Sequence, residues 1–267
     1  DALPIFSGPG CIDCHNTGGV PGAIVPSNGA DVRPMHEGKT GITERQALRA
    51  KYKLELSTPV KVDDISSKAK AMITMIQDTS WITELDIIEQ ASFEARAQPT
   101  IDKLVHKILS KVTTTLSDDF GEFLISVTAQ DTLELHYNHN KVPLAELFKE
   151  KKTGNPGFDF HTETSTQLLA YGEAKYSGNI NPYTKALKQI KGFLDEKKDK
   201  MELTDLKHFT SKESINNALE DKKAFVAAFS INSDDPSSII KNALSSVHID
   251  DLLVYDELYI IGIEVDA

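Results

Sequence analysis

Apolar residues in the second half of the chain follow strand and helix patterns in turn. "AFVAAFSI" (224–231) is a continuous apolar run, typical of a strand covered on both faces of a sheet. In 181–200, Ala186, Leu187, Ile190 and Leu194 recur at helical spacing. The predicted order is strand 158–162, strand 166–177, helix 181–200, strand 224–231, helix 235–247 and strand 258–265. This order predicts a mixed α/β layer fold.

The first half has a different pattern. A charged helix is expected over 43–57, followed by a long helical tract over 66–116 that breaks near Ser80 or Thr83 and at Pro99. Ser117 is the expected N-cap of a further helix, in which Phe120, Leu124 and Val127 form the apolar side and Glu122 lies beside it.

Composition divides the chain into three parts. Residues 1–41 hold 8 of the 15 glycines and 5 of the 11 prolines, which indicates an irregular arm. A helical region is expected over 42–116 and an α/β domain over 117–267. No apolar run approaches the ~18–20 residues that span a membrane, so no membrane association is expected.

The net charge of −11 argues against a purely electrostatic DNA coat. Between Lys141 and Lys207, however, 12 lysines face 10 acids, so a nucleic-acid face, if present, is expected there. Lys185, Lys188 and Lys191 lie along the 181–200 helix, and Lys197, Lys198 and Lys200 lie at its end. They are candidate phosphate contacts, although cations also complement a helix C-terminus.

Three charged residues lie within the predicted hairpin. Glu173 and Lys175 are two apart on a strand and therefore share one side of the sheet, while Asp159 on the preceding strand is close enough to approach Glu173. Paired carboxylates suit Mg²⁺ or Mn²⁺, and without a cation they would repel each other. A lysine beside such a metal can orient or deprotonate water, so the set is suited to phosphodiester hydrolysis of DNA.

The spacing D-(x)13-E-x-K on a hairpin followed by a helix resembles the PD-(D/E)XK nuclease superfamily, whose core is αβββαβ. Within it, the motifs Gly121-Glu122, Gly157-Phe158-Asp159 and Gly172-Glu173-Ala174-Lys175 most resemble HamA, the effector family of the Hachiman anti-phage system. The position before Asp159 holds Phe158 where many members have proline.

The resemblance covers roughly 117–265 and implies a restriction-endonuclease-like mixed sheet core with a helical N-terminal region. It implies metal binding by Asp159, Glu173 and Glu122, a catalytic role for Lys175 and a further role for Gln189. It also implies a DNA endonuclease that works with a helicase partner.

"CIDCH" (Cys11, Cys14, His15) matches the attachment motif of c-type haem, with Met35 as a candidate distal ligand. Zinc binding by Cys11 and Cys14 with His15 or His36 is a second interpretation, and a chain arm with two reduced thiols is a third. Two cysteines are too few for a disulfide scaffold, so a cytoplasmic location is expected.

Two other function classes stay open. One is a catalytically silent nuclease-like protein that binds DNA or a partner. The other is a haem electron-transfer protein built around Cys11, Cys14 and His15.

Overall fold

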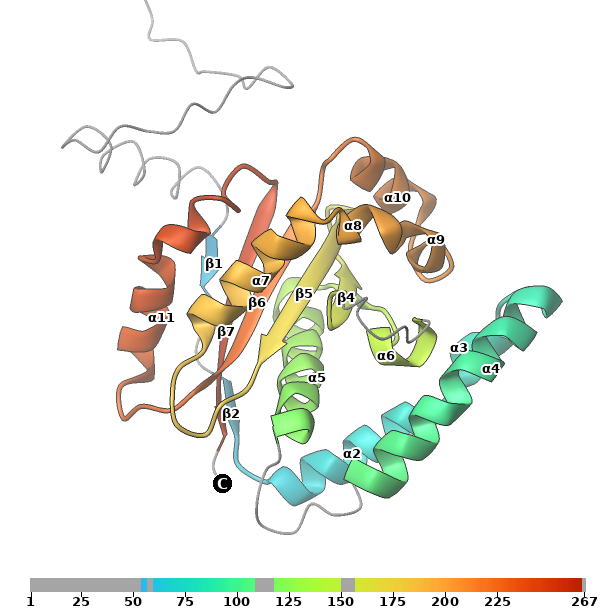
Figure 1. Ribbon diagram of the computed structural model, residues 1–267, viewed down its shortest axis with the longest axis horizontal. Helices are drawn as coiled ribbons and strands as arrows, with labels where there is room; N and C mark the ends of the chain where they lie inside the picture. Colours follow the sequence, from blue (N-terminus) through green and yellow to red (C-terminus); the bar gives the residue numbers. More distant parts are fainter. Residues whose placement is uncertain (1–53, 57–59, 109–117, 150–156, 266–267) are drawn as a thin grey trace, which may run out of the picture.

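A mixed sheet forms the centre of the molecule. The structure is a computed structural model and describes residues 54–56, 60–108, 118–149 and 157–265 (Figure 1). In these ranges seven strands form one sheet in the order β1-β7-β6-β5-β4-β3, and β2 also pairs with β7. The strands are β1 Leu54–Leu56, β2 Val60–Val62, β3 Asn140–Lys141, β4 Phe160–Glu163, β5 Leu169–Lys175, β6 Ala224–Ile231 and β7 Glu257–Val265.

Parallel and antiparallel pairing divide this sheet. β5, β6, β7, β1 and β2 run parallel to one another, while β4 is antiparallel to β5 and β3 to β4. The mixed α/β class predicted from the strand and helix patterns is confirmed. The two strands of the 158–177 hairpin, β6 and β7 all form where the patterns predicted them.

Helices cover both faces of the sheet (Figure 1). α7 (Tyr183–Asp195) connects β5 to β6, and α11 (Pro236–Leu244) connects β6 to β7. Both connections join parallel neighbours, and right-handed crossovers place both helices on one face. α5 (Asp118–Tyr137) packs on the other. All eight residues of β6 are therefore buried, as the apolar run predicted.

Other helices complete the fold around this core. They are α2 Ile65–Gln77, α3 Ser80–Thr83, α4 Ile87–Lys103, the π-helix η1 Leu104–Ile108, α6 Ala145–Phe148, α8 Lys198–Met201, α9 Leu203–Leu206, α10 Lys212–Leu219 and the 3₁₀-helix η3 Val247–Ile249. Among the described residues, no helix combines the length and apolarity needed to cross a membrane.

Two predictions for the first half were wrong. Pro99 does not end a helix but lies inside α4, where buried Ala97, Thr100 and Ile101 hold the helix against the core. Packing on both sides of the proline stabilises the helix more than the loss of one backbone hydrogen bond at Pro99 destabilises it. Residues 54–56, placed in the predicted 43–57 helix, form strand β1, because the edge of β7 offers them a parallel partner.

Aromatic contacts join the helices of the first half to the second. The Trp81 ring meets Phe93 and Phe209 edge-on, with ring centroids 5.9 and 5.3 Å apart. Phe209 also contacts Phe148, at 5.0 Å. The region 60–108 therefore shares packing with the residues that follow the sheet hairpin.

Candidate functional site

β5 and α5 bring an ammonium group and two carboxylates together. Glu173 and Lys175 lie on the same side of β5, and the Lys175 Nζ is 2.6 Å from Glu173 Oε1. The same Nζ is 3.4 Å from Oε1 of Glu122 on α5. Glu173 is fully buried, whereas the Glu122 side chain is 43% exposed. Glu122 thus lies at the border of the site, beside the apolar side of its helix.

Asp159 joins the site from the other strand of the hairpin. It directly precedes β4, and its backbone N–H donates to the Gly172 carbonyl at 2.9 Å. Its Oδ2 accepts from the Ala174 N–H at 2.8 Å, between Glu173 and Lys175 in the chain. The structure thus brings Asp159, Glu173 and Lys175 near one another, and their roles stay predictions.

The charges of these groups shift one another's proton affinities. Burial raises the pKa of Glu173 well above its usual value, and the negative charge of Asp159 raises it further. Asp159 is half-buried by surface area, yet protein atoms surround it closely enough that lost hydration raises its pKa too. Burial opposes the charge on Lys175, but the nearby carboxylates outweigh burial and raise the pKa of this lysine. Lys175 is therefore a cation at neutral pH.

Both oxygens of Glu173 are buried without a hydrogen-bond partner among the described residues. Lys175 is close to Oε1, but its approach angles are not those of a hydrogen bond. A buried carboxylate in this condition is costly unless a cation compensates it. Mg²⁺ prefers oxygen ligands and is commonly held by one or two carboxylates plus waters, so Asp159 and Glu173 fit this ion.

The expected third metal ligand does not join the other two. In the described part of the chain, no group of three or more His, Cys, Asp or Glu side chains is arranged to hold a metal ion. Glu122 instead lies next to the Lys175 ammonium. The donor set present is therefore Asp159 with Glu173, and Glu122 contributes negative charge near the lysine.

Gln189 and the six lysines are the other predicted residues that the structure describes. Gln189 is half-buried on α7, and within the described residues its side chain makes no hydrogen bond to Asp159, Glu173 or Lys175. The six lysines do not form a uniform patch. Lys198 is buried, Lys191 pairs with Asp195 and Lys200 pairs with Asp221. Lys185, Lys188 and Lys197 are exposed.

A buried ionic group that the sequence did not indicate supports Asp159. Glu202, between α8 and α9, accepts from the Phe158 N–H at 3.1 Å and lies 2.6 Å from Lys149 Nζ. Lys149 in turn donates to the Phe158 carbonyl at 2.5 Å. Both backbone groups of the residue before Asp159 are thus fixed. Glu202 lies in a lysine-rich segment that gave no signal of burial.

The three glycines of the motifs all face closely packed groups. A Cβ at Gly121 would be 2.2 Å from the Tyr176 ring, and one at Gly172 would be 2.3 Å from the Phe160 ring. A Cβ at Gly157 would be 2.1 Å from a Glu202 carboxylate oxygen. Each glycine therefore permits a close approach next to a candidate site residue.

A pocket of about 380 Å³ lies beside the cluster, at the carboxyl ends of β5, β6 and β7. It is lined by 176–178, 230–232 and Val265. The carboxyl ends of parallel strands are the usual location of ligand sites in α/β sheets. Tyr176, one of its lining residues, directly follows Lys175 in the chain.

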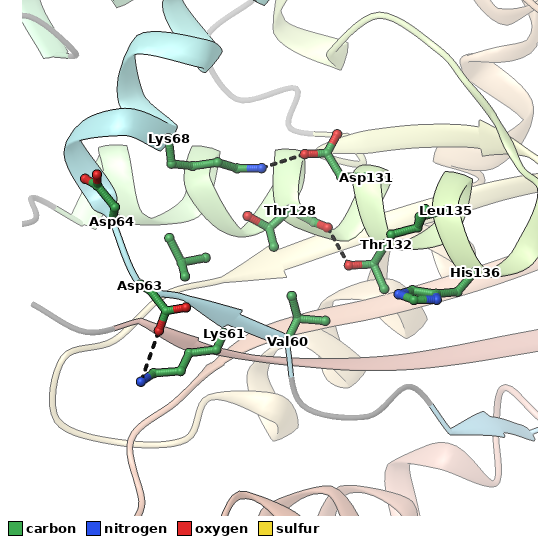
Figure 2. A pocket seen from close by; sticks show the side chains of 11 residues that line it. Val60, Lys61, Asp63, Asp64, Lys68, Thr128, Asp131, Thr132, Leu135 and His136 are labelled. Atoms are coloured by element: carbon green, nitrogen blue, oxygen red, sulfur yellow. Dashed lines mark hydrogen bonds and ion pairs between the residues drawn. The ribbon is translucent and has the colours of Figure 1, made fainter.

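Figure 2 shows a different pocket, of about 370 Å³, between β2, α2 and α5. Its charged groups pair with one another: Lys61 lies 3.1 Å from Asp63, and Lys68 lies 2.5 Å from Asp131. Each of these lysines thus has an acid beside it, whereas at the cluster the single positive charge of Lys175 lies near both Glu173 and Asp159.

The strongest chemical feature of the described chain is thus the group formed by Asp159, Glu173 and Lys175. The N-terminal motif of Cys11, Cys14 and His15, with Met35 and His36, lies outside the described residues, so its haem and zinc interpretations stay predictions. Comparisons of the chain with protein-family models, with curated proteins and with solved structures found no match.

Proposed function

We propose that this protein is a metal-dependent DNA endonuclease of the PD-(D/E)XK type. The observation that carries the proposal is the buried Glu173 carboxylate, which lacks a hydrogen bond and lies beside Asp159 and Lys175. The order of α5, β3, β4, β5, α7 and β6 supports it, because it follows the αβββαβ order of that superfamily, with α6 inserted after β3 and α8, α9 and α10 inserted after α7.

Asp159 and Glu173 would hold Mg²⁺ or Mn²⁺. When bound, the ion would supply a Lewis acid that polarises the phosphate and lowers the pKa of water. Lys175, a cation at neutral pH, would orient the attacking water and stabilise the negative charge that develops on the phosphate. Its raised pKa argues against a role as general base. Glu122 would keep the lysine in place by its charge.

The proposed setting is an anti-phage defence complex in which a helicase partner supplies the DNA. The proposal follows the likeness of the three glycine-acid motifs to the HamA family. The net charge of −11 fits a nuclease that relies on a partner, because such a chain repels nucleic acid on average.

One observation favours a second candidate function. Only two acids converge within the described residues, and a site with so few ligands suits a protein that binds DNA or a partner without cleaving it. Both candidates predict DNA binding, so cleavage separates them.

The test is plasmid cleavage with Mg²⁺ or Mn²⁺, with and without a helicase. The Lys175→Ala variant is expected to lose cleavage while its circular dichroism spectrum stays unchanged. Lys241→Ala, which changes an exposed lysine on α11, is the matched control and should cleave normally. Full activity of Lys175→Ala would refute the assignment, and DNA binding by a wild-type protein without cleavage would favour the silent alternative.

A further inference from the structure

The pocket at the carboxyl ends of β5, β6 and β7 begins one residue after Lys175 of the candidate catalytic cluster. Tyr176 lines it and directly follows Lys175 in the chain. The Tyr176 ring packs over Gly121, next to Glu122, because only a glycine leaves room for it there. A molecule in the pocket would therefore lie beside Lys175.

The lining of this pocket is uncharged. It consists of Tyr176, Ser177, Gly178, Ser230, Ile231, Asn232 and Val265, none of which carries a formal charge at neutral pH. Without a lysine or arginine the pocket has no group that would attract a phosphate, whereas Lys175, the residue before Tyr176, carries a positive charge. The pocket thus suits a neutral part of a ligand whose anionic part lies at the cluster.

The hydrogen bonds around the pocket leave specific groups for a ligand. Ser230 Oγ is used twice, because it donates to the Ser177 carbonyl at 3.0 Å and accepts from the Ser177 N–H at 2.9 Å. Ser177 Oγ accepts from the N–H groups of Asn179 and Ile180, both at 3.3 Å, so its own hydroxyl hydrogen is available as a donor.

Asn232 provides the complementary acceptor. Its Nδ2 donates to the Gly178 carbonyl at 2.6 Å, which fixes the amide so that Oδ1 is the group available to a ligand. A hydroxyl donor, an amide acceptor and an aromatic ring together match a planar heterocycle that carries both donors and acceptors. A nucleobase has this chemistry, and bases are commonly bound by stacking with a few polar contacts.

We propose that this pocket binds an unpaired nucleobase of the DNA strand, adjacent to the phosphate that the cluster acts on. The inference rests on the proposed function and adds the form of its substrate. A base within a duplex is stacked and its pairing edge is occupied, so only a base of a single strand or an extruded base can enter a pocket. The substrate then has an unpaired base at the point of cleavage.

The test compares two oligonucleotides by fluorescence anisotropy, with Ca²⁺ in place of Mg²⁺. One is a 12-mer of deoxythymidine and the other is a 12-mer of abasic deoxyribose phosphate, which carries the same backbone charge. We expect the wild-type protein to bind the thymidine oligonucleotide about tenfold more tightly, the size of effect typical of a stacked base.

Two variants change the pocket in different ways. Val265→Phe adds bulk from β7 and leaves the hydrogen bonds of 177–181 intact, while Asn232→Leu removes the acceptor. Both should reduce the tenfold preference to near unity without changing the affinity for the abasic oligonucleotide. Asn242→Leu, the same change at an exposed position of α11, is the control and should keep the preference.

The outcomes separate this inference from the proposed function. A preference for bases that persists in both pocket variants, or no preference in the wild-type protein, overturns the pocket assignment even if plasmid is cleaved. A preference that both variants abolish supports the pocket even if the wild-type protein cleaves nothing, in which case the nuclease proposal alone fails.

Discussion

Oε2 of Glu202 lies 2.6 Å from Nε2 of His161, and both residues are buried beneath the β4–β5 hairpin. Because the carboxylate is an acceptor, Nε2 carries the imidazole hydrogen, and Nδ1 is left buried without a partner among the described residues. A second proton on Nδ1 would have no acceptor there. Burial lowers the pKa of His161 and outweighs the Glu202 carboxylate, which raises it, while the positive charge of Lys149 lowers it further.

This pair predicts acid sensitivity of the fold. The folded chain favours neutral His161, so its contribution to stability is complete above the unfolded pKa of about 6.5 and is lost as the pH falls below it. His139, whose pKa burial lowers to about 4, acts in the same direction. Each should lower the free energy of unfolding by about 1.4 kcal/mol per pH unit below pH 6.5.

Urea denaturation between pH 8 and pH 5 measures this slope. His161→Gln keeps a donor for Glu202 but removes the titration, so it should reduce the slope by about half. His136→Gln, an exposed histidine on α5, should leave it nearly unchanged. An unaltered slope in His161→Gln would show that the buried pair does not govern the acid response.

Gly172→Ala should destabilise the protein by about 1–3 kcal/mol, because the added methyl group meets the Phe160 ring in a packed core. Gly192→Ala is the matched change on α7, where a Cβ has no neighbour within 4 Å. It should stabilise the protein by about 1 kcal/mol, the usual gain for alanine in a helix. Equal midpoints of chemical denaturation for the two variants would refute the close packing at Gly172.

Glu173→Gln should stabilise the fold while removing activity. The folded pKa of Glu173 is raised, so its favourable contribution is present below the unfolded value of about 4.5 and is lost as the pH rises toward the folded pKa. Glutamine stays neutral, so a gain of about 1 kcal/mol is expected at pH 8. Thermal unfolding measures it, with exposed Glu94→Gln on α4 as the control. A stability at pH 8 no higher than that of the wild-type protein would contradict the assigned cost of the buried carboxylate.

Asp159→Asn should fold normally and lose its response to divalent cations. The amide oxygen can still accept from the Ala174 N–H, but the ligand charge is gone. Mg²⁺ at 100 times its Kd should add about 2.7 kcal/mol to the stability of the wild-type protein and nothing to that of the variant. Asp195→Asn, an exposed acid on α7, should keep the full response. The same response in Asp159→Asn would remove this carboxylate from the metal site.

The sequence predicted the site hairpin because its cause is local. Alternation with a period of two places Glu173 and Lys175 on one side of a strand, and a short connection places Asp159 on the next strand. The apolar run of β6 likewise predicted a buried strand, because a strand that is covered on both faces of a sheet is apolar along its whole length. These features depend on neighbouring residues in the chain.

The features that the sequence did not predict depend on contacts between residues far apart in the chain. Glu202 meets Phe158 and Lys149 only after α8 and α9 fold back on the hairpin, and no spacing in the chain indicates that contact. Pro99 was predicted to end a helix because local propensity favours an end there, but packing on both sides keeps α4 continuous. The burial of such residues could not be predicted, because no pattern among their neighbours in the chain indicates it.

The pairing of Leu54 in β1 with Leu258 in β7 affects how the protein is made. β7 follows the other described strands in the chain, so during synthesis β1 and β2 cannot pair until all of them have been made. Until then, and in any shortened chain that starts after residue 62, β7 has an open edge of amide and carbonyl groups. Such an edge recruits strands from other molecules, which makes aggregation the expected result of N-terminal trimming.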